Sequence, residues 1–397
     1  MNGGADQTLS AALVGNGVIA GNHVRAMAAN GVLRVAALVD PDPAARARIA
    51  ELIAAETSWP PPAQFETLTE ALRAGAPDVV VIATPSGTHV ELALEAVAAG
   101  AHVVIEKPLD TRVGKALPLR DAAREASGRG QIVSVISQHR FDPASVVVAE
   151  AAHSGRLGRL TSAVATVPWW RSQQYYDSGE WRGTWQLDGG GSTMNQGVHT
   201  VDLLVWLLGR PRSVFAYAAV LAHDGLAVED TAAAAVRFES GAIAVLHTTT
   251  AAYPGLGVRL NVHGSLGSAL IEGDRLEYFY AAPAADADAA RDSNADPTRG
   301  GPRNLAPDLV AADQLAGGEP APDAFTQGHR RQYDDIVAAI RERRPPTVGV
   351  EDALLSLAVV RALYVSAALG AEVGVDEILS GAHDDVTFDP NSQEEPS

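Results

Sequence analysis

Short apolar runs alternate with segments of helical periodicity over the first 140 residues of the chain. The apolar runs predict buried strands at residues 8–15, 34–39, 78–83, 101–106 and 131–137. Helices are predicted between them, at residues 22–30, 43–56, 67–74, 88–99 and 114–127. Strands that are almost continuously apolar and alternate with helices are typical of a parallel sheet covered on both faces. We therefore predict a doubly wound α/β domain over residues 8–140.

The pattern changes after residue 140, where few helices separate the strands. A predicted helix at 144–154 is followed by strand-like runs at residues 159–168, 213–222, 230–239, 241–250, 257–263 and 274–280. Residues 281–324 are rich in Ala, Asp, Pro and Gly and predict a long surface loop, and helices follow at 328–343 and 351–369. We predict a second α/β domain over residues 141–372 with a mainly antiparallel sheet, and an acidic tail over residues 373–397.

Length and composition limit the classes of function. A chain of 397 residues favours two domains, and the lack of cysteine excludes disulfides, thiolate nucleophiles and cysteine-bound zinc. The formal net charge of −18 disfavours nucleic acid as a partner. Residues 1–10 lack the features of a signal peptide, and no run approaches the ~20 apolar residues that span a bilayer. We expect a cytoplasmic protein without membrane contact.

The first candidate site is a glycine-rich turn between the first strand and the first helix. It comprises Gly15, Asn16, Gly17, Val18, Ile19 and Ala20. Gly15 allows a tight turn, Gly17 lets the backbone approach a pyrophosphate, and Ala20 allows helix and strand to pack closely. The N–H groups at the helix start would bind the phosphates. The pattern predicts a dinucleotide site over residues 15–19, and the alternative is a glycine turn in another α/β fold.

Asp40 lies at the end of the second strand, about 20 residues after the glycine-rich turn. Its carboxylate would accept hydrogen bonds from the adenosine ribose hydroxyls. It would also repel a 2′-phosphate, and no arginine follows directly because Pro41 is next. These features favour NAD over NADP as the cofactor.

Two more candidates follow the third and fourth strands, at the edge where open parallel sheets bind their ligands. The candidate positions there are Thr84, Pro85, Ser86, His89, Glu106 and Lys107. We predict that these residues contact the cofactor. The Lys107 ammonium would also hydrogen-bond a substrate oxygen and stabilise alkoxide character during hydride transfer. The alternatives are an ordinary capped loop and a strand that ends in a turn.

A glycine-rich segment at residues 187–202 holds the densest set of polar candidates. Asn195, His199 and Asp202 are spaced i, i+4 and i+7, so on a helix they would share a face. His199 suits the proton transfer of an alcohol–ketone interconversion near neutral pH. The alternative is a core histidine beside a hydrogen-bonded Asp. No third ligand lies at a spacing that predicts a metal site.

An aromatic segment at residues 169–185 lies just upstream. It contains four Trp, two Tyr and two Arg, in a chain with only 5% aromatic residues. Aromatic faces beside polar donors suit polyhydroxylated rings, so we predict that Arg171, Tyr175 and Arg182 bind the substrate. The alternative is a core or subunit-contact cluster.

Taken in order, these motifs resemble the Gfo/Idh/MocA oxidoreductase family, which includes glucose–fructose oxidoreductase and inositol dehydrogenase. The similarity covers roughly residues 8–372 and rests on Asp40 and on segments 15–20, 83–89, 106–108, 138–141, 189–202 and 328–370. The resemblance implies an N-terminal Rossmann domain and a C-terminal α/β domain with a large open sheet. It also implies homo-dimers or homo-tetramers that assemble through that sheet.

By the same resemblance, Lys107 and His199 match the family's catalytic lysine and histidine. Lys107 would orient the substrate and lower the effective pKa of its hydroxyl, and His199 would exchange the hydroxyl proton. Asn195 stands where many members have Asp, although nucleotide-sugar 3-dehydrogenases also have Asn. An Asn cannot share a proton with His199, but it can fix the ring by hydrogen bonding. We place Lys107, Asn195 and His199 in both the catalytic and the substrate-binding sets.

The implied activity is that of an NAD(P)-dependent oxidoreductase, which moves a hydride to or from a secondary alcohol of a sugar or cyclitol. Two alternatives use the same fold. A redox-assisted glycoside hydrolase would oxidise a ring position transiently, eliminate the aglycone and re-reduce the ring. A non-catalytic NAD(P)-binding regulator would need neither Lys107 nor His199, and this chain has both.

Overall fold

The computed structural model describes residues 8–179, 182–283, 302–318 and 321–389. The chain divides into two compact units. Unit 1 consists of Met1–Gln138, Gln186–Gly189 and Pro322–Leu357, and unit 2 of His139–Trp185, Gly190–Ala321 and Ala358–Ser397. The chain therefore returns to unit 1 twice, whereas the sequence pattern suggested consecutive domains.

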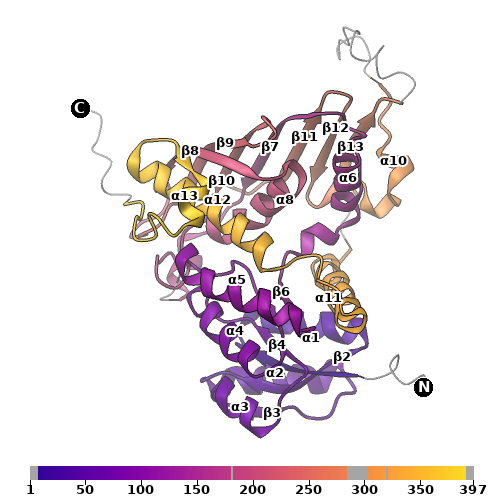
Figure 1. Cartoon of the computed structure of the whole chain (residues 1–397), viewed down its shortest axis with the longest axis vertical. Coiled ribbons are helices and arrows are strands. Elements are labelled where there is room, and N and C mark those ends of the chain that lie inside the picture. The colour runs from indigo at the N-terminus through magenta and orange to yellow at the C-terminus, as the bar shows by residue number, and fades with distance from the viewer. Residues whose placement is uncertain (1–7, 180–181, 284–301, 319–320, 390–397) are drawn as a thin grey trace. The chain divides into compact units, whose positions relative to one another are not determined.

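Unit 1 is built on a parallel sheet of six strands in the order β3-β2-β1-β4-β5-β6 (Figure 1). The strands are β1 (Leu9–Val14), β2 (Leu33–Val39), β3 (Ala63–Phe65), β4 (Val79–Ile82), β5 (His102–Ile105) and β6 (Val133–Val135). This sheet confirms the predicted doubly wound fold. Strand β3 was not predicted because it is three residues long and no residue in it is buried, so it has no apolar run.

The helices of unit 1 are α1 (Val18–Asn30), α2 (Pro43–Glu56), α3 (Leu68–Ala74), α4 (His89–Ala98), α5 (Val113–Gly128) and α11 (Ala324–Glu342). Local signals fix where several of them begin. The Asp42 side chain accepts the Ala44 N–H at the start of α2, and Thr67 with Glu70 forms a capping box at the start of α3. Helix α11 comes from the far end of the chain and packs against α1, where Tyr333 and Ile336 join the core of the sheet.

Unit 2 is built on a mixed sheet of eight strands in the order β13-β12-β11-β7-β10-β9-β8-β14. The strands are β7 (Leu160–Pro168), β8 (Pro211–Ala219), β9 (Thr231–Phe238), β10 (Ile243–Thr249), β11 (Arg259–Gly264), β12 (Gly267–Glu272), β13 (Arg275–Ala281) and β14 (Val373–Gly374). Only β7 and β10 pair in parallel among these strands, so the prediction of a mainly antiparallel sheet is confirmed.

Helices α6 (Pro143–His153) and α8 (Val198–Leu208) contact the sheet of unit 2. The burial of side chains alternates along β8, β9 and β10, as expected for a sheet with one covered and one open face. The segment η2 (Gln138–Phe141) leads into α6, and the short α7 (Gln173–Asp177) follows β7. Of the side chains that the sequence assigned to the substrate, Tyr175 lies on α7 and His199 on α8.

Three sequence predictions in this part of the chain need correction. Strand β12 was missed, because residues 267–272 are mostly half-buried and give no strong apolar run. Residues 306–309 form α10 inside the range predicted as a loop, while residues 284–301 of that range lie outside the described residues. The tail predicted from residue 373 is wrong for its first part. Strand β14 pairs with β8 there, and α13 (Val375–Leu379) follows with Val375 and Ile378 buried.

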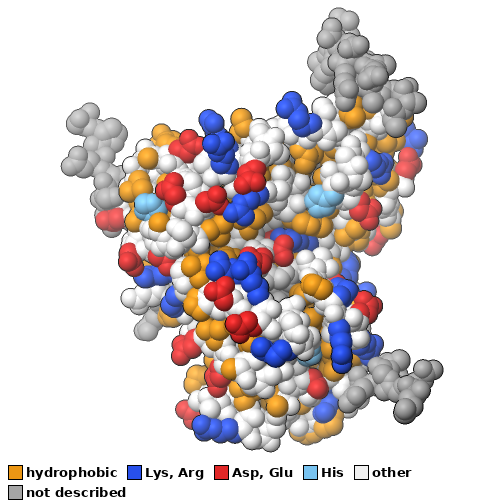
Figure 2. All heavy atoms as spheres, viewed as in Figure 1, with side chains coloured by type: hydrophobic (Ala, Val, Ile, Leu, Met, Phe, Trp, Pro, Cys, Tyr) orange, Lys and Arg blue, Asp and Glu red, His pale blue; other side chains and the backbone are white. Residues whose placement is uncertain are grey.

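The helix α12 (Val350–Leu369) is long and apolar enough to cross a membrane by length and composition, although the sequence reading expected no such run. Within its most apolar stretch, 67% of the residues are buried inside the protein, as is typical of a core helix. On the face drawn in Figure 2, acidic and basic side chains are interspersed with apolar ones. The negative net charge therefore forms no continuous acidic patch on that face.

Candidate functional site

The glycine-rich turn of unit 1 requires glycine at its first position. Gly15 has φ +85°, and a Cβ there would lie 2.5 Å from the Ala83 carbonyl oxygen at the end of β4. Helix α1 starts directly after Gly17, and no side chain caps its N-terminus. Val18, in its first turn, is 97% exposed. The first N–H groups of α1 therefore face a surface that suits a phosphate.

Asp40 is tied to the glycine-rich turn by a hydrogen bond. Its carboxylate accepts the Asn16 N–H at 2.7 Å and the Asp42 N–H at 2.8 Å. A carboxylate has room for further donors, so these bonds fix the group without using all its acceptor sites. Arg46, which the sequence reading did not consider, donates to the Asp40 carbonyl oxygen. A cation thus lies beside Asp40 although Pro41 follows it in the sequence.

The loop after β4 is held by its own polar groups. The Thr88 hydroxyl lies 2.8 Å from both the Thr84 hydroxyl and the Pro85 carbonyl oxygen. Pro85 is exposed and Ser86 is buried. The His89 ring is 1% exposed, and its two nitrogens each lie 2.8 Å from a carbonyl oxygen, of Pro108 and of Thr84. His89 therefore joins the loops after β4 and β5 from the interior.

Lys107 follows β5 and is half-buried, and its peptide bond to Pro108 is cis. Burial lowers the pKa of Lys107, and the nearby carboxylates of Glu106 and Asp188 oppose that shift. Glu106 itself is 5% exposed, and its Oε1 lies 3.1 Å from His23 Nε2 and 3.4 Å from His329 Nε2. Its second oxygen accepts the Lys107 N–H at 3.1 Å. Glu106 is thus occupied by partners within unit 1.

In unit 2, a π-helical turn at Thr193–Gly197 precedes α8 and carries Asn195. The preceding glycines are required by close packing, since a Cβ on Gly191 would overlap the Glu229 carbonyl oxygen. The Glu229 carboxyl is fully buried and accepts the N–H groups of Gly191 at 2.9 Å and Thr193 at 2.8 Å. Burial raises the pKa of Glu229 to about 7, against these hydrogen bonds. Glu229 shapes the turn before His199, and no sequence motif identified it.

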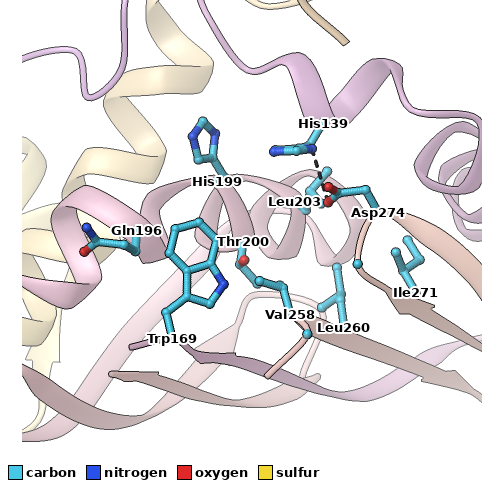
Figure 3. Close-up of a pocket in the computed structure, with 12 residues that line it drawn as sticks. His139, Trp169, Gln196, His199, Thr200, Leu203, Val258, Leu260, Ile271 and Asp274 are labelled. Atoms are coloured by element: carbon cyan, nitrogen blue, oxygen red, sulfur yellow. Dashed lines mark ion pairs between the residues drawn. The ribbon is translucent and has the colours of Figure 1, made fainter. Parts of the chain in front are cut away.

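A pocket of about 230 Å³ lies in unit 2 beside α8 (Figure 3). It is lined by His139, Trp169, Gln196, His199, Thr200, Leu203, Gly257, Val258, Leu260, Ile271, Gly273 and Asp274. Four of these residues, at positions 196, 199, 200 and 203, follow the i, i+3, i+4 and i+7 spacing of one helical face. The predicted proton carrier His199 therefore lines a pocket with a largely apolar floor.

His199 lies at the border between the pocket face of the helix and the face that the sequence predicted. Asn195 and Asp202 do not line this pocket, whereas Gln196 does. At about 100° per residue, Gln196, Thr200 and Leu203 fall to one side of His199, and Asn195 and Asp202 fall to the other. The Asp202 carboxylate instead forms two hydrogen bonds of 2.7 Å with the Arg140 guanidinium, and both side chains are buried. This ion pair ties η2 to α8.

His139 lies beside His199, with ring centroids 5.0 Å apart and the planes almost perpendicular. Its Nδ1 is 2.8 Å from the Asp142 carboxylate and 3.3 Å from that of Asp274 (dashed in Figure 3). Burial lowers the pKa of His139, but Asp274, Asp142 and Asp202 outweigh that effect and raise it to about 9. One wall of the pocket is therefore an imidazolium–carboxylate pair at neutral pH.

The structure brings together the three residues of the aromatic segment that were predicted to bind substrate, namely Arg171, Tyr175 and Arg182. The Tyr175 ring has the Arg171 guanidinium at 4.9 Å and the Arg182 guanidinium at 4.2 Å, and Arg171 also lies 5.1 Å from Trp169. The Tyr175 hydroxyl accepts a hydrogen bond from Gln196 Nε2 at 3.4 Å. This aromatic cluster (Trp169, Arg171, Tyr175, Arg182) therefore continues into the pocket wall. Among the other aromatic residues of the segment, Trp185 packs on Tyr364, and Trp181 lies outside the described residues.

Comparison with known proteins identifies the family. Residues 9–135 match the model of an oxidoreductase family with an NAD-binding Rossmann fold, and residues 146–270 match the GFO/IDH/MocA C-terminal domain. A solved structure, the WlbA dehydrogenase from Bordetella pertussis in complex with NADH and UDP-GlcNAcA, is 33% identical with a TM-score of 0.76. The alignment covers 93% of this chain and 98% of that one. The chain belongs to the GFO/IDH/MocA oxidoreductase family.

The alignments with relatives found by sequence cover a smaller share of each relative's length than the alignment with the WlbA dehydrogenase does. Inositol 2-dehydrogenase of Rhizobium meliloti is 29% identical over 68% of this chain and 77% of that protein. An uncharacterized oxidoreductase of Synechocystis is 29% identical over 54% of this chain, and the chain spans only 60% of its length. Membership of the GFO/IDH/MocA family confirms the predicted enzyme class and NAD as the cofactor.

In this GFO/IDH/MocA oxidoreductase, two clusters among the described residues have side-chain types that bind metals. They are His23, Glu106 and His329 in unit 1, and His139, Asp142 and Asp274 in unit 2. The two His139 contacts of 2.8 and 3.3 Å and the two Glu106 contacts of 3.1 and 3.4 Å are hydrogen-bond distances. Direct hydrogen bonding and charge pairing account for both clusters without an ion.

Proposed function

We propose that this oxidoreductase moves a hydride between NAD and a secondary alcohol or ketone of a sugar derivative. The observation that carries the proposal is the pocket at His199, which combines a proton carrier, an apolar floor and the aromatic cluster. Its substrate class is supported by the WlbA dehydrogenase, which is similar over 93% of this chain and was solved with UDP-GlcNAcA. A nucleotide sugar is therefore the first substrate to test.

Unit 1 has the features that would hold NAD. The uncapped start of α1 after Gly15, Asn16 and Gly17 would bind the pyrophosphate, with Val18 and Ile19 in the turn that it covers. Asp40 would accept the ribose hydroxyls, and the loop at Thr84, Pro85 and Ser86 would lie along the cofactor. His89 and Glu106 would support these loops from within. When bound, NAD supplies the hydride acceptor.

Lys107 and His199 have separate roles in this proposal. The Lys107 ammonium donates a hydrogen bond to the substrate oxygen and stabilises alkoxide character as the hydride leaves. His199 accepts the hydroxyl proton during oxidation and returns it during reduction. Asn195, half-buried on the π-turn before His199, is a hydrogen-bonding residue here, because an amide does not titrate.

The aromatic cluster is assigned to substrate binding. The guanidinium groups of Arg171 and Arg182 both contact the ring of Tyr175, which holds the two cations beside it. Paired guanidiniums suit the phosphate or carboxylate groups of a nucleotide sugar or a sugar acid. The Trp169 ring offers an apolar surface to a sugar ring at the mouth of the pocket.

The test is the appearance of reduced nicotinamide with NAD and a panel of nucleotide sugars, free sugars and inositols. We expect turnover with one group of substrates. Lys107→Ala and His199→Ala should each lower kcat by roughly 10²-fold or more and leave NAD binding nearly unchanged. His247→Ala, on β10, is the control and should retain activity. Near-wild-type rates in both variants would disprove the assigned roles, and glycoside cleavage without net NADH would favour the redox-assisted hydrolase.

A further inference from the structure

The Glu106 carboxylate is a buried charge beside the proposed catalytic lysine, and its hydrogen-bond partners come from two helices distant in sequence. His23 lies on α1 and His329 on α11, and both rings are at most 1% exposed. Their Nε2 atoms lie 3.1 and 3.4 Å from the same carboxylate oxygen, Oε1. Burying an isolated carboxylate costs free energy of folding, so the position of Glu106 needs a functional or a structural explanation.

The hydrogen bonds of His23 fix which nitrogen carries its proton. Its Nδ1 lies 2.8 Å from the hydroxyl of Tyr333, another α11 residue that is fully buried. Burial lowers the pKa of His23, although Glu106 opposes the shift, and this favours the neutral ring. A neutral ring with hydrogen on Nε2 donates to Glu106 and accepts from the Tyr333 hydroxyl. A hydrogen-bond relay therefore runs from Tyr333 through His23 to Glu106, and each of the three groups in it acts as a donor or an acceptor.

This hydrogen-bond relay keeps Glu106 ionised in the interior. Burial raises the pKa of Glu106, but the hydrogen bonds from His23 and His329 outweigh it and hold the pKa well below its ordinary value. The Oε2 atom meanwhile accepts the backbone N–H of Lys107 at 3.1 Å. The two oxygens thus have different tasks, since one is held by the histidines and the other fixes the backbone that carries the lysine.

Nearby negative charges favour the ammonium form of Lys107 where it lies. Burial lowers the pKa of Lys107, and Glu106 and Asp188 are the two carboxylates that oppose this effect. Further ionisable groups near this segment, among the described residues, include Asp110, which lies 3.9 Å from the Lys115 ammonium, and the buried ring of His89. Loss of the Glu106 charge would leave Asp188 as the remaining carboxylate that supports the ammonium.

We propose that His23 and His329 are positioning residues for Lys107, which they support by holding the Glu106 carboxylate charged and in one orientation. The proposal rests on the proposed function only in that Lys107 acts as a hydrogen-bond donor to substrate. His23 has the larger share, because its contact is shorter and its donor nitrogen is fixed by Tyr333. Neither histidine touches the substrate in this account.

The amino-acid sequence allows a direct test, because Lys107 and Lys115 are the only lysines of the protein. Protein labelled with ¹³C at the lysine ε-carbon should give two side-chain signals, which Lys115→Arg assigns. The ε-carbon shift reports ionisation, so a pH titration gives the pKa of Lys107 without any enzyme assay. Lys115, with a side chain 53% exposed, is an internal control in every spectrum.

Glu106→Gln should lower the pKa of Lys107 by about one to three pKa units and leave Lys115 unchanged. His23→Leu should shift Lys107 in the same direction by less, because it removes the donor. His23→Gln retains an N–H donor of similar reach and should restore most of the wild-type value. His329→Leu should have the smallest effect. If Glu106→Gln does not fold, the His23→Leu and His23→Gln pair still tests the relay.

An unchanged Lys107 titration in Glu106→Gln would overturn the proposal. Equal values in His23→Leu and His23→Gln, both at the wild-type position, would overturn the role of His23. A stoichiometric bound metal in purified protein that is lost in His23→Leu would also overturn it, because a coordination site would then explain the cluster. The same variants should move the basic limb of the kcat/KM profile to lower pH. If no sugar is oxidised but the titrations shift as expected, the proposed function fails and this inference stands.

Discussion

At the scale of single residues, Gln196 is the pocket residue that the sequence reading passed over in favour of its neighbour Asn195. Its side chain is 6% exposed and lines the pocket beside His199, and its Nε2 donates to Tyr175. Its Oε1 is buried without a hydrogen-bond partner in the described protein. A buried acceptor left without a donor is costly, so a substrate hydroxyl or N–H that reaches it would gain a strong preference.

Gln196→Leu should therefore lower kcat/KM by roughly tenfold, which corresponds to one hydrogen bond of ordinary strength. Most of the loss should appear in KM, because the contact exists before and during hydride transfer. Steady-state kinetics with the best substrate of the panel measures it. Gln174→Leu, the same change on an exposed residue of α7, is the matched control. Equal kcat/KM in the two variants would contradict this role for Gln196.

We predict that the charge of the Asp40 carboxylate, with Arg46 beside it, decides the preference for NAD over NADP. Asp40→Ala removes the carboxylate that repels a 2′-phosphate, while Arg46 stays next to the Asp40 carbonyl oxygen. We expect NADH affinity to fall about tenfold and NADPH affinity to rise, as measured by the fluorescence of the bound reduced cofactor. Adding Arg46→Ala should remove the gain for NADPH. Wild-type protein that binds NADPH more tightly than NADH would show that Asp40 has been misread.

At the scale of secondary-structure elements, the sequence predicted what depends on local periodicity. The long apolar strands, the helices between them and the turn at Gly15 needed no knowledge of packing. The π-turn at Thr193–Gly197 could not be predicted in this way. It depends on the fit of Gly191 against Glu229, and it has no regular period that can be read from the sequence. Motif position likewise put His89 and Glu106 near the cofactor, and only their burial showed that they support the loops from inside.

The η2 segment makes unit 2 sensitive to pH through His139. The pKa of this ring is about 9 in the folded protein, above its ordinary value of 6.5, because Asp274 and Asp142 outweigh burial. A raised histidine pKa contributes stability that is fully present below pH 6.5 and is lost as pH rises through 9. The contribution is at most about 3 kcal/mol.

Urea unfolding at a series of pH values measures this contribution. The unfolding midpoint of the wild type should decrease between neutral pH and pH 9, and the decrease should be much smaller in His139→Gln. His247→Gln, on β10, is the control and should follow the wild type. A His139→Gln variant with the wild-type dependence would show that other groups cause it.

At the scale of the whole molecule, the open face of the sheet in unit 2 carries apolar side chains across neighbouring strands. Val164 on β7 pairs with Val245 on β10, and Val245 pairs with Ala235 on β9, so these residues lie in one row on the same face. Val245 is 49% exposed, and Tyr217 on β8 is 68% exposed. Neighbouring exposed apolar residues on a flat sheet are typical of a surface that another protein covers.

We expect this face to join two copies of the chain, because a twofold axis lets one self-complementary surface bury both apolar rows. Val245→Asp would then place two charges in each interface and should convert the oligomer to the 41.3 kDa monomer, measured by sedimentation velocity. Leu369→Asp is the matched control, since Leu369 is similarly exposed at the end of α12. Wild-type protein that sediments as a monomer at every concentration would rule out this interface. Dissociation by both variants alike would mean that the added charge, and not its place on the sheet, drives the change.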